Sequence, residues 1–446
     1  MQEADPNYNF YIAKGRLPVV DRAAGVTIRD TDGKDYIDAC SGAVICNIGY
    51  GQTAITEAIL RQAQQTFFAY RLHFENRPAL DYAKALVEQS ADHLDRVFFV
   101  SGGSEAVESA VKLCRQYFYD THQGSRHIFI SRVPSYHGCT LGTLALTAYA
   151  PLEAPYRPLM KSCPKIPAPY CYRCAYNLTY PACDLMCARE LEKTILEQGP
   201  ENVAGFVAEP IGGASTGALV PPDDYFDLIQ AICKKYGIML ILDEVMTGFG
   251  RTGTLFAYEH WDVKADIVAL SKGMASGYFP LGAIVAGHDI VEKVLDSGGF
   301  KHGHTYAGNP MACAVGLEVL NLMLEKDLCA NSRSMGSRLK NGLDKLAHEI
   351  PIIGQVRGRG LLLGVELVRD PKTKEPLPVD ANAAQLLTDI AFDNGLIVYP
   401  RRSINGMAGD HVLVSPPLIV SADEVDEILK RFSEALRKTM DKLDVA

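Results

Sequence analysis

Two kinds of apolar pattern alternate along the chain from about residue 80 onward. Segments with the 3.6-residue period of an amphipathic helix alternate with short, continuously apolar segments that are typical of buried strands. Buried strands that alternate with helices predict a mostly parallel sheet with helices on both faces, which is the α/β class of fold. The predicted helices span 80–94, 105–120 and 225–237, and the predicted strands span 96–103, 126–132, 203–210, 238–245 and 266–273.

The two ends of the chain carry a different pattern. Residues 25–40 contain an Asp-Gly turn between alternating apolar and polar residues, which predicts a β-hairpin. The C-terminal part mixes helix and strand patterns, with strands predicted at 360–370 and 395–400 and a loop after the second of them. We therefore predict a large α/β domain and a smaller α+β domain from both termini, with boundaries at 61–330 for the first and at 1–60 and 331–446 for the second.

Composition and charge exclude several classes of protein. The 446 residues are 48% apolar and carry a net charge of −9, with no run of basic residues, so we expect no nucleic-acid partner. No apolar run approaches the roughly 18 residues that a membrane-spanning helix needs. The first twenty residues lack a basic segment followed by an apolar one, so we expect no secretory signal and a cytoplasmic protein.

Lys272 stands where an apolar strand gives way to a glycine-rich segment. A buried ammonium is costly unless it has a partner or a chemical role. One interpretation is a lysine whose amine reaches solvent at the end of the strand. The other is a desolvated amine that acts as a nucleophile and forms a Schiff base. This stretch of sequence leaves both interpretations open.

Two other predicted strand ends carry residues that suit ligand binding, because ligands of parallel sheets bind outside the carboxyl ends of the strands. Gly103 and Ser104 lie between a strand and a helix, where they either hold an anion or only cap the helix. Asp243 and Glu244 end a strongly apolar strand. They are a metal-binding pair, a ligand-binding aspartate, or one buried acid beside one exposed acid.

A further strand end presents Tyr136 and His137 before a glycine, and this tyrosine is either part of the core or a platform for a ring. One ligand would satisfy all of these strand ends: pyridoxal phosphate (PLP), which has a phosphate, an aldehyde and a ring nitrogen that needs an acidic partner. Lys272 would hold the aldehyde and act as general acid and base. Asp243 would keep the ring nitrogen protonated, and Tyr136 would stack on the ring.

Seven motifs give the chain a clear resemblance to the class III PLP-dependent aminotransferases of fold type I, over roughly residues 10–440. In order along the chain they read SGGSEAVE, SYHG, AEPIGG, LDEVMTGFGRTG, LSKG, HTYAGNP and SPPLIV. The resemblance implies a large domain with a seven-stranded sheet. It also implies an enzyme that moves an amino group from a donor to a keto acid in a ping-pong cycle.

The resemblance assigns the site residues one by one. It makes Lys272 the Schiff-base lysine and Asp243 the partner of the ring nitrogen, and it places Val245 on the ring face opposite Tyr136. Thr305 would reach the phosphate of a neighbouring subunit, which implies a homodimer or a dimer of dimers. The complete set of predicted cofactor-binding residues is Gly103, Ser104, Tyr136, His137, Glu209, Asp243, Val245, Lys272 and Thr305.

Departures from the family pattern bear on the substrate. Glutamate-using members often carry an acid at the position of Ala214 and an arginine at the position of Leu413. The chain lacks both, so it resembles the ω-amino acid or amine–pyruvate branch instead. Val44 stands where that branch often has tryptophan. Arg71 stands where it often has phenylalanine, and it would either bind an acidic substrate group or form a structural ion pair.

The predicted loop after 395–400 holds Arg401 and Arg402 among small residues. One of them would be a mobile arginine that binds the carboxylate of the keto acid, or both are solvated arginines on the surface. The nearest aligned residue to the mobile arginine of the amine–pyruvate branch is Tyr399. Because Leu413 stands where glutamate-using members often have an arginine that binds the α-carboxylate, we expect pyruvate to be a better acceptor than 2-oxoglutarate.

An irregular, proline-rich segment at 151–185 interrupts the alternation, and its cysteines and aromatic residues argue that it is ordered. Cys171 and Cys174, followed by Cys183 and Cys187, are close to the spacing of a zinc ribbon. The alternative is four free thiols, and no catalytic metal is expected. Two other functions stay open: a PLP-dependent decarboxylase or aminomutase on the same fold, and a catalytically silent scaffold with a metal clip.

Overall fold

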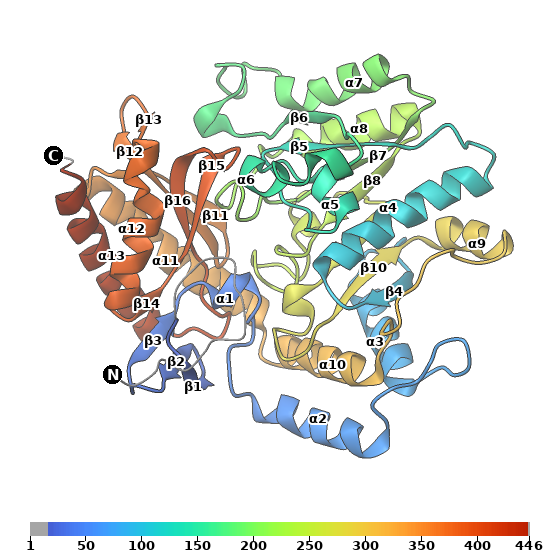
Figure 1. Ribbon diagram of the computed structural model, residues 1–446, viewed down its shortest axis with the longest axis horizontal. Coiled ribbons are helices and arrows are strands. Elements are labelled where there is room, and N and C mark those ends of the chain that lie inside the picture. Colours follow the sequence, from blue (N-terminus) through green and yellow to red (C-terminus); the bar gives the residue numbers. More distant parts are fainter. Residues whose placement is uncertain (1–16, 445–446) are drawn as a thin grey trace.

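The computed structural model describes residues 17–444, and its central element is a seven-stranded sheet (Figure 1). In spatial order its strands are β4 (Arg96–Val100), β10 (Gly282–Ala286), β9 (Ile267–Leu270), β8 (Met239–Asp243), β7 (Val203–Ala208), β5 (Ile128–Val133) and β6 (Lys165–Pro167). Strands β9, β8, β7, β5 and β6 run parallel, whereas β10 is antiparallel to both of its neighbours. This sheet confirms the predicted α/β class and the seven-stranded architecture.

Alternate residues of the central strands face two different hydrophobic cores. In β8, Ile241 packs in a core with α4 (Gly103–Asp120), and Leu240 packs in the opposite core with α8 (Tyr225–Tyr236). Because helices cover both faces, neither face of the strand requires a polar residue, and the sequence is apolar throughout. No helix within residues 17–444 is long and apolar enough to cross a membrane. The other helices of this part are α2 (Thr53–Gln65), α3 (Arg77–Gln89), α5 (Leu141–Leu146), α7 (Met186–Gln198), α9 (His288–Asp296) and α10 (Pro310–Glu325).

Strands from both ends of the chain build a second region beside this sheet (Figure 1). One sheet joins β1 (Val20–Ala24), β2 (Thr27–Asp30) and β3 (Asp35–Asp38) to β14 (Leu396–Ile397). The other contains β11 (Ile353–Arg359), β12 (Leu362–Asp370), β13 (Glu375–Pro376), β15 (Tyr399–Ile404) and β16 (Ala408–Val414), and nearby lie α1 (Ser41–Val44), α11 (Leu328–Glu349), α12 (Ala383–Asp393) and α13 (Ala422–Leu443). The predicted hairpin at 25–40 is confirmed, and the domain boundaries stay a prediction; residues 1–16 lie outside the described part.

The segment that carries Arg401 and Arg402 is a β-hairpin, so the prediction of a loop there is wrong. Strands β15 and β16 pair antiparallel and are joined by a turn at Asn405 and Gly406. Both turn residues have positive φ, 48° and 74°, as the tight Asn-Gly turn of a hairpin requires. The two arginines therefore lie on a paired strand.

The irregular segment 151–185 is ordered, as predicted, and it adds the edge strand β6 to the large sheet. This strand has only three residues, of which Ile166 is buried, and it contains Pro167. A strand so short has no readable period, and proline is tolerated only because the strand lies at the edge. The segment also holds the short helices α6 (Ala150–Glu153), η1 (Arg157–Leu159) and η2 (Cys171–Arg173).

A buried arginine ties the two regions together. The guanidinium of Arg251 donates to the side chains of Ser41 and Asn47 and to the carbonyl oxygens of Leu361 and Pro416, at 2.6–3.1 Å. Arg251 is fully buried, and burial lowers its pKa to about 10. The charge is thus solvated by oxygens of three distant chain segments in place of water.

We predict that Arg251→Met lowers the free energy of unfolding by about 3 kcal/mol or more, because several buried oxygens would lose their donor. The matched control is Arg437→Met, since Arg437 forms an exposed ion pair with Glu349 and should contribute less than about 1 kcal/mol. Urea denaturation of both variants measures the difference. Equal stabilities would show that Arg251 does not hold the regions together.

Candidate active site

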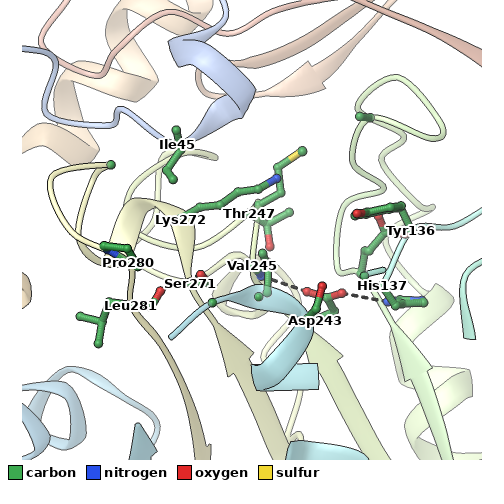
Figure 2. Close-up of a pocket in the computed structure, with 18 of the residues that line it drawn as sticks. Ile45, Tyr136, His137, Asp243, Val245, Thr247, Ser271, Lys272, Pro280 and Leu281 are labelled. Atoms are coloured by element: carbon green, nitrogen blue, oxygen red, sulfur yellow. Dashed lines mark hydrogen bonds and ion pairs between the residues drawn. The ribbon is translucent and has the colours of Figure 1, made fainter. Parts of the chain in front are cut away.

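A cavity of about 450 Å³ opens at the carboxyl ends of the parallel strands (Figure 2). It is bordered by residues at or after the carboxyl ends of five strands, β4, β5, β7, β8 and β9. Eight of the predicted cofactor-binding residues meet there, although they are far apart in the sequence. They are Gly103, Ser104, Tyr136, His137, Glu209, Asp243, Val245 and Lys272.

Lys272 lies two residues after the end of β9 and begins a short helix, η4 (Lys272–Met274), with a left-handed backbone at φ 45°. Its side chain lies in the cavity (Figure 2). Burial lowers its pKa to about 8, although the carboxylates of Asp243 and Glu209 oppose this shift. The amine is therefore partly neutral near neutral pH, as a nucleophile must be. The alternative of a lysine that reaches bulk solvent does not fit this placement.

Asp243 lies at the floor of the cavity with both carboxylate oxygens engaged (Figure 2). Oδ1 accepts from the backbone N–H of Val245 at 3.0 Å, and Oδ2 lies 2.8 Å from Nδ1 of His137. The neighbouring Glu244 does not border this cavity and instead accepts from Thr247 and from the backbone of Tyr258. Both acids are buried and face different ways, which excludes a metal-binding pair and the alternative of one exposed acid.

An anion site lies opposite Lys272, at the N-terminus of α4. Gly103 has no room for a side chain, because a Cβ atom there would lie 2.8 Å from a methyl group of Val245. Ser104 Oγ accepts from the backbone N–H of Cys139 at 3.1 Å. The 18-residue helix adds positive potential where its first N–H groups are free. These features fit the phosphate of PLP.

The residues as a set fit PLP. The cavity lies within the usual range of about 300–1,000 Å³ for a small-molecule site. Lys272 would hold the aldehyde and move protons at the substrate carbon, Asp243 would hold the proton of the ring nitrogen, and Tyr136 borders the space where the ring would lie. When bound, PLP supplies an electron-accepting ring that stabilises negative charge on the substrate.

Five predicted site residues do not border this cavity: Val44, Arg71, Thr305, Arg401 and Arg402. Val44 is buried with 1% of its surface exposed, and its neighbour Ile45 borders the cavity in its place. Arg71 and Thr305 border a second cavity of about 710 Å³, where the Arg71 guanidinium lies 4.8 Å from the ring centre of Phe98. The predicted contact of Thr305 with a neighbouring subunit stays a prediction.

The side chains of the two arginines of the hairpin have different partners. Arg401 lies over the ring of Tyr399, at 4.3 Å from the ring centre, and donates to its hydroxyl oxygen. Arg402 is anchored elsewhere, with Nε 3.4 Å from the buried carboxylate of Asp410. Adjacent strand residues face opposite ways, so only one arginine can serve the site.

Four cysteines border one small cavity of about 20 Å³: Cys171, Cys174, Cys183 and Cys187. All four are free thiols. Burial raises the pKa of Cys187 to about 11, so this thiol is protonated at neutral pH. Within residues 17–444, no group of three or more His, Cys, Asp or Glu side chains is arranged to hold a metal ion. This geometry favours four thiols over a zinc ribbon.

The cavity contains residues that the sequence analysis did not single out. Ile45, Ile211, Thr247 and Phe279 border it, and they come from segments without a strand or helix pattern. Ile211 and Thr247 lie within motifs that carried the family resemblance, AEPIGG and LDEVMTGFGRTG. The others reach the site through tertiary packing, for which a single sequence offers no signal.

A lysine, an aspartate and the N-terminus of a helix meet at one sheet edge, in an arrangement that fits a PLP-dependent enzyme of fold type I. The family model of aminotransferase class-III matches residues 11–436. The chain therefore belongs to the class III aminotransferases. These enzymes depend on PLP and transfer amino groups between an amine or amino acid and a keto acid.

Relatives are similar over almost the whole chain. The aminotransferase YodT of Bacillus subtilis is 41% identical, over 96% of this chain and 97% of that protein. The putrescine–pyruvate aminotransferase of Pseudomonas aeruginosa is 34% identical, over 94% of this chain and 91% of that protein. The crystal structure of a thermostable (S)-enantioselective omega-transaminase from Thermomicrobium roseum superposes with a TM-score of 0.91 at 35% identity, covering 98% and 97% of the two chains.

We predict that PLP attachment to the apoenzyme follows the titration of Lys272. Because the neutral amine is the nucleophile and its pKa is lowered to about 8, the attachment rate should rise about tenfold from pH 7 to pH 9 and then level off. Stopped-flow absorbance of PLP measures the rate. A lysine with its ordinary pKa of 10.5 would instead show a rise of about a hundredfold, without a plateau.

Proposed function

We propose that this transaminase takes its amino group from an ω-amino acid or amine and passes it to pyruvate, in a ping-pong cycle of two half-reactions. The observation that carries the proposal is the placement of charge around the cavity. Ala214 borders the cavity, and the buried Leu413 lies on β16, so neither position supplies the charged group that glutamate-using members keep there. A fixed clamp for an α-carboxylate beside an acidic side chain is therefore missing.

The hairpin offers a different cation for a carboxylate. Tyr399 on β15 is directly opposite Leu413 on β16, and the side chains of such a pair share one face of the sheet. Arg401 lies two residues further along β15, so it shares that face. Arg401 would thus supply, from the neighbouring strand, the positive charge that is missing at Leu413, and a charge-assisted, bidentate contact would hold the carboxylate of pyruvate.

Two relatives support this branch of the family by their names. The Pseudomonas aeruginosa relative is a putrescine–pyruvate aminotransferase, and the Thermomicrobium roseum structure is that of an omega-transaminase. We also propose a homodimer or a dimer of dimers. The second cavity, with Thr305, lies near large apolar residues that are exposed in the single chain, including Phe67, Leu72 and Tyr306.

The proposed reaction is tested with a panel of amines and ω-amino acids as donors and pyruvate as acceptor. We expect one alanine formed per donor consumed, no turnover without a keto acid, and a rate at least about 10³-fold lower in Lys272→Ala, because that variant loses the acid and base. Carbon dioxide release or donor rearrangement without a keto acid would instead establish a decarboxylase or an aminomutase.

We predict that Arg401→Ala raises the KM for pyruvate about 10- to 100-fold, because one charge-assisted contact is lost. Arg402→Ala is the matched control and should leave this KM unchanged, since Arg402 binds Asp410. With one simple amine as donor, the measurement is kcat/KM for pyruvate and for 2-oxoglutarate in all three proteins. A wild-type preference for 2-oxoglutarate would overturn the choice of acceptor, and unchanged pyruvate kinetics in Arg401→Ala would remove Arg401 from substrate binding.

A further inference from the structure

Several buried polar atoms behind Asp243 lack a hydrogen-bond partner among the described residues. They include Nε2 of His137, Oε2 of Glu209, Nε of Arg132 and the hydroxyl group of Tyr225. Each such atom costs about 1–3 kcal/mol if it stays unpaired. Protein interiors usually satisfy such groups with ordered water. The concentration of these atoms beside the catalytic carboxylate therefore calls for a physical explanation.

Glu209 and His137 both border the cavity, and they follow the neighbouring strands β7 and β5. His137 uses Nδ1 for Asp243, so Nε2 points away from that carboxylate. Glu209 follows β7, the strand beside β8, and its Oε1 accepts from the backbone N–H of Gly213 at 3.0 Å. Its free Oε2 lies 3.9 Å from the Arg132 guanidinium, too far for a direct hydrogen bond.

The ionisable groups of Glu209, His137 and Arg132 also interact with one another. Burial raises the pKa of Glu209, and His137 and Arg132 oppose that shift. Both Glu209 and His137 border the active-site cavity, yet the two unpaired atoms themselves are closed off from solvent. A group inserted between them would thus be held by protein alone.

We propose that one buried water molecule joins Oε2 of Glu209 to Nε2 of His137, and that Glu209 thereby positions the His137–Asp243 pair. The proposal rests on Asp243 as the partner of the cofactor's ring nitrogen. It makes Glu209 a positioning residue that acts through His137. The relay would run across three neighbouring segments, those that follow β7, β5 and β8, and would fix the carboxylate that faces the ring.

The first test is a crystal structure of the holoenzyme at a resolution that shows ordered water. The expected result is one water within about 3.2 Å of both Oε2 of Glu209 and Nε2 of His137. An empty gap, or a direct bond between the two side chains, would overturn the water relay. Neither result depends on the donor or acceptor, so failure here is distinct from failure of the proposed reaction.

The second test compares two substitutions of Glu209 by the rate at which the holoenzyme releases PLP. Glu209→Leu should release PLP about 10- to 100-fold faster, the range seen when an outer partner of a ligand-holding histidine is lost. Glu209→Gln should stay within about threefold of wild type, because burial already disfavours the charge and the amide keeps a hydrogen-bonding group. Tyr225→Phe is the control, since it removes a buried hydroxyl group in the same layer and should leave the release rate unchanged.

Circular dichroism of the bound-cofactor band adds a readout of ring orientation that a purely structural role would not move. It should change in Glu209→Leu and not in Glu209→Gln. Release of PLP from Glu209→Leu at the wild-type rate, or equally accelerated release from both Glu209 variants, would overturn the positioning role. If Glu209→Leu does not fold, as judged by the thermal midpoint of the apoenzyme, the crystal structure and Glu209→Gln decide the outcome.

Discussion

A buried carboxylate that must stay hydrogen-bonded is the constraint on which this site depends. Only 4% of the surface of Asp243 is exposed, and an isolated carboxylate at such a depth would be very costly. The backbone of Val245 and the ring of His137 each satisfy one oxygen. The turn after β8 and the turn after β5 must therefore meet at one edge of the sheet, and the cavity forms where they do.

A second buried charge cluster explains why the irregular segment 151–185 is ordered without a helix or strand period. Glu366 on β12 binds Arg357 and, from that segment, Arg173, each at 2.6 Å. Arg357 also donates to the carbonyl oxygen of Thr216 at 2.8 Å, two residues from Ala214 in the cavity wall. One carboxylate thus connects the cysteine-rich segment, the C-terminal sheet and the active-site wall, and order there comes from paired charge.

The sequence predicted the strand ends of the site well, because the carboxyl ends of parallel strands share one edge. Lys272 and Asp243 stand at two of these strand ends, and the family resemblance then chose between the interpretations that the pattern left open. The prediction from sequence failed where the position of a side chain depends on local backbone geometry. Val44 has a left-handed backbone at φ 57°, and Ile45, one residue later, reaches the cavity. The hairpin at 399–414 was not predicted because the small residues around the two arginines also suit a loop, whereas in the structure Asn405 and Gly406 form the turn between paired strands.

The hairpin also shows how one site can take a carboxylate and an uncharged substrate in turn. A cation fixed at Leu413, deep in β16, would stay in the cavity for every substrate. Arg401 lies nearer the turn of the hairpin, and its guanidinium rests on Tyr399. An aromatic face offers an arginine a partner worth about 0.5–2 kcal/mol, less than a carboxylate offers. In the proposed reaction the arginine would therefore have a resting partner when the substrate is uncharged and a stronger one when a carboxylate arrives, and the difference between these two contacts would set the preference for the acceptor.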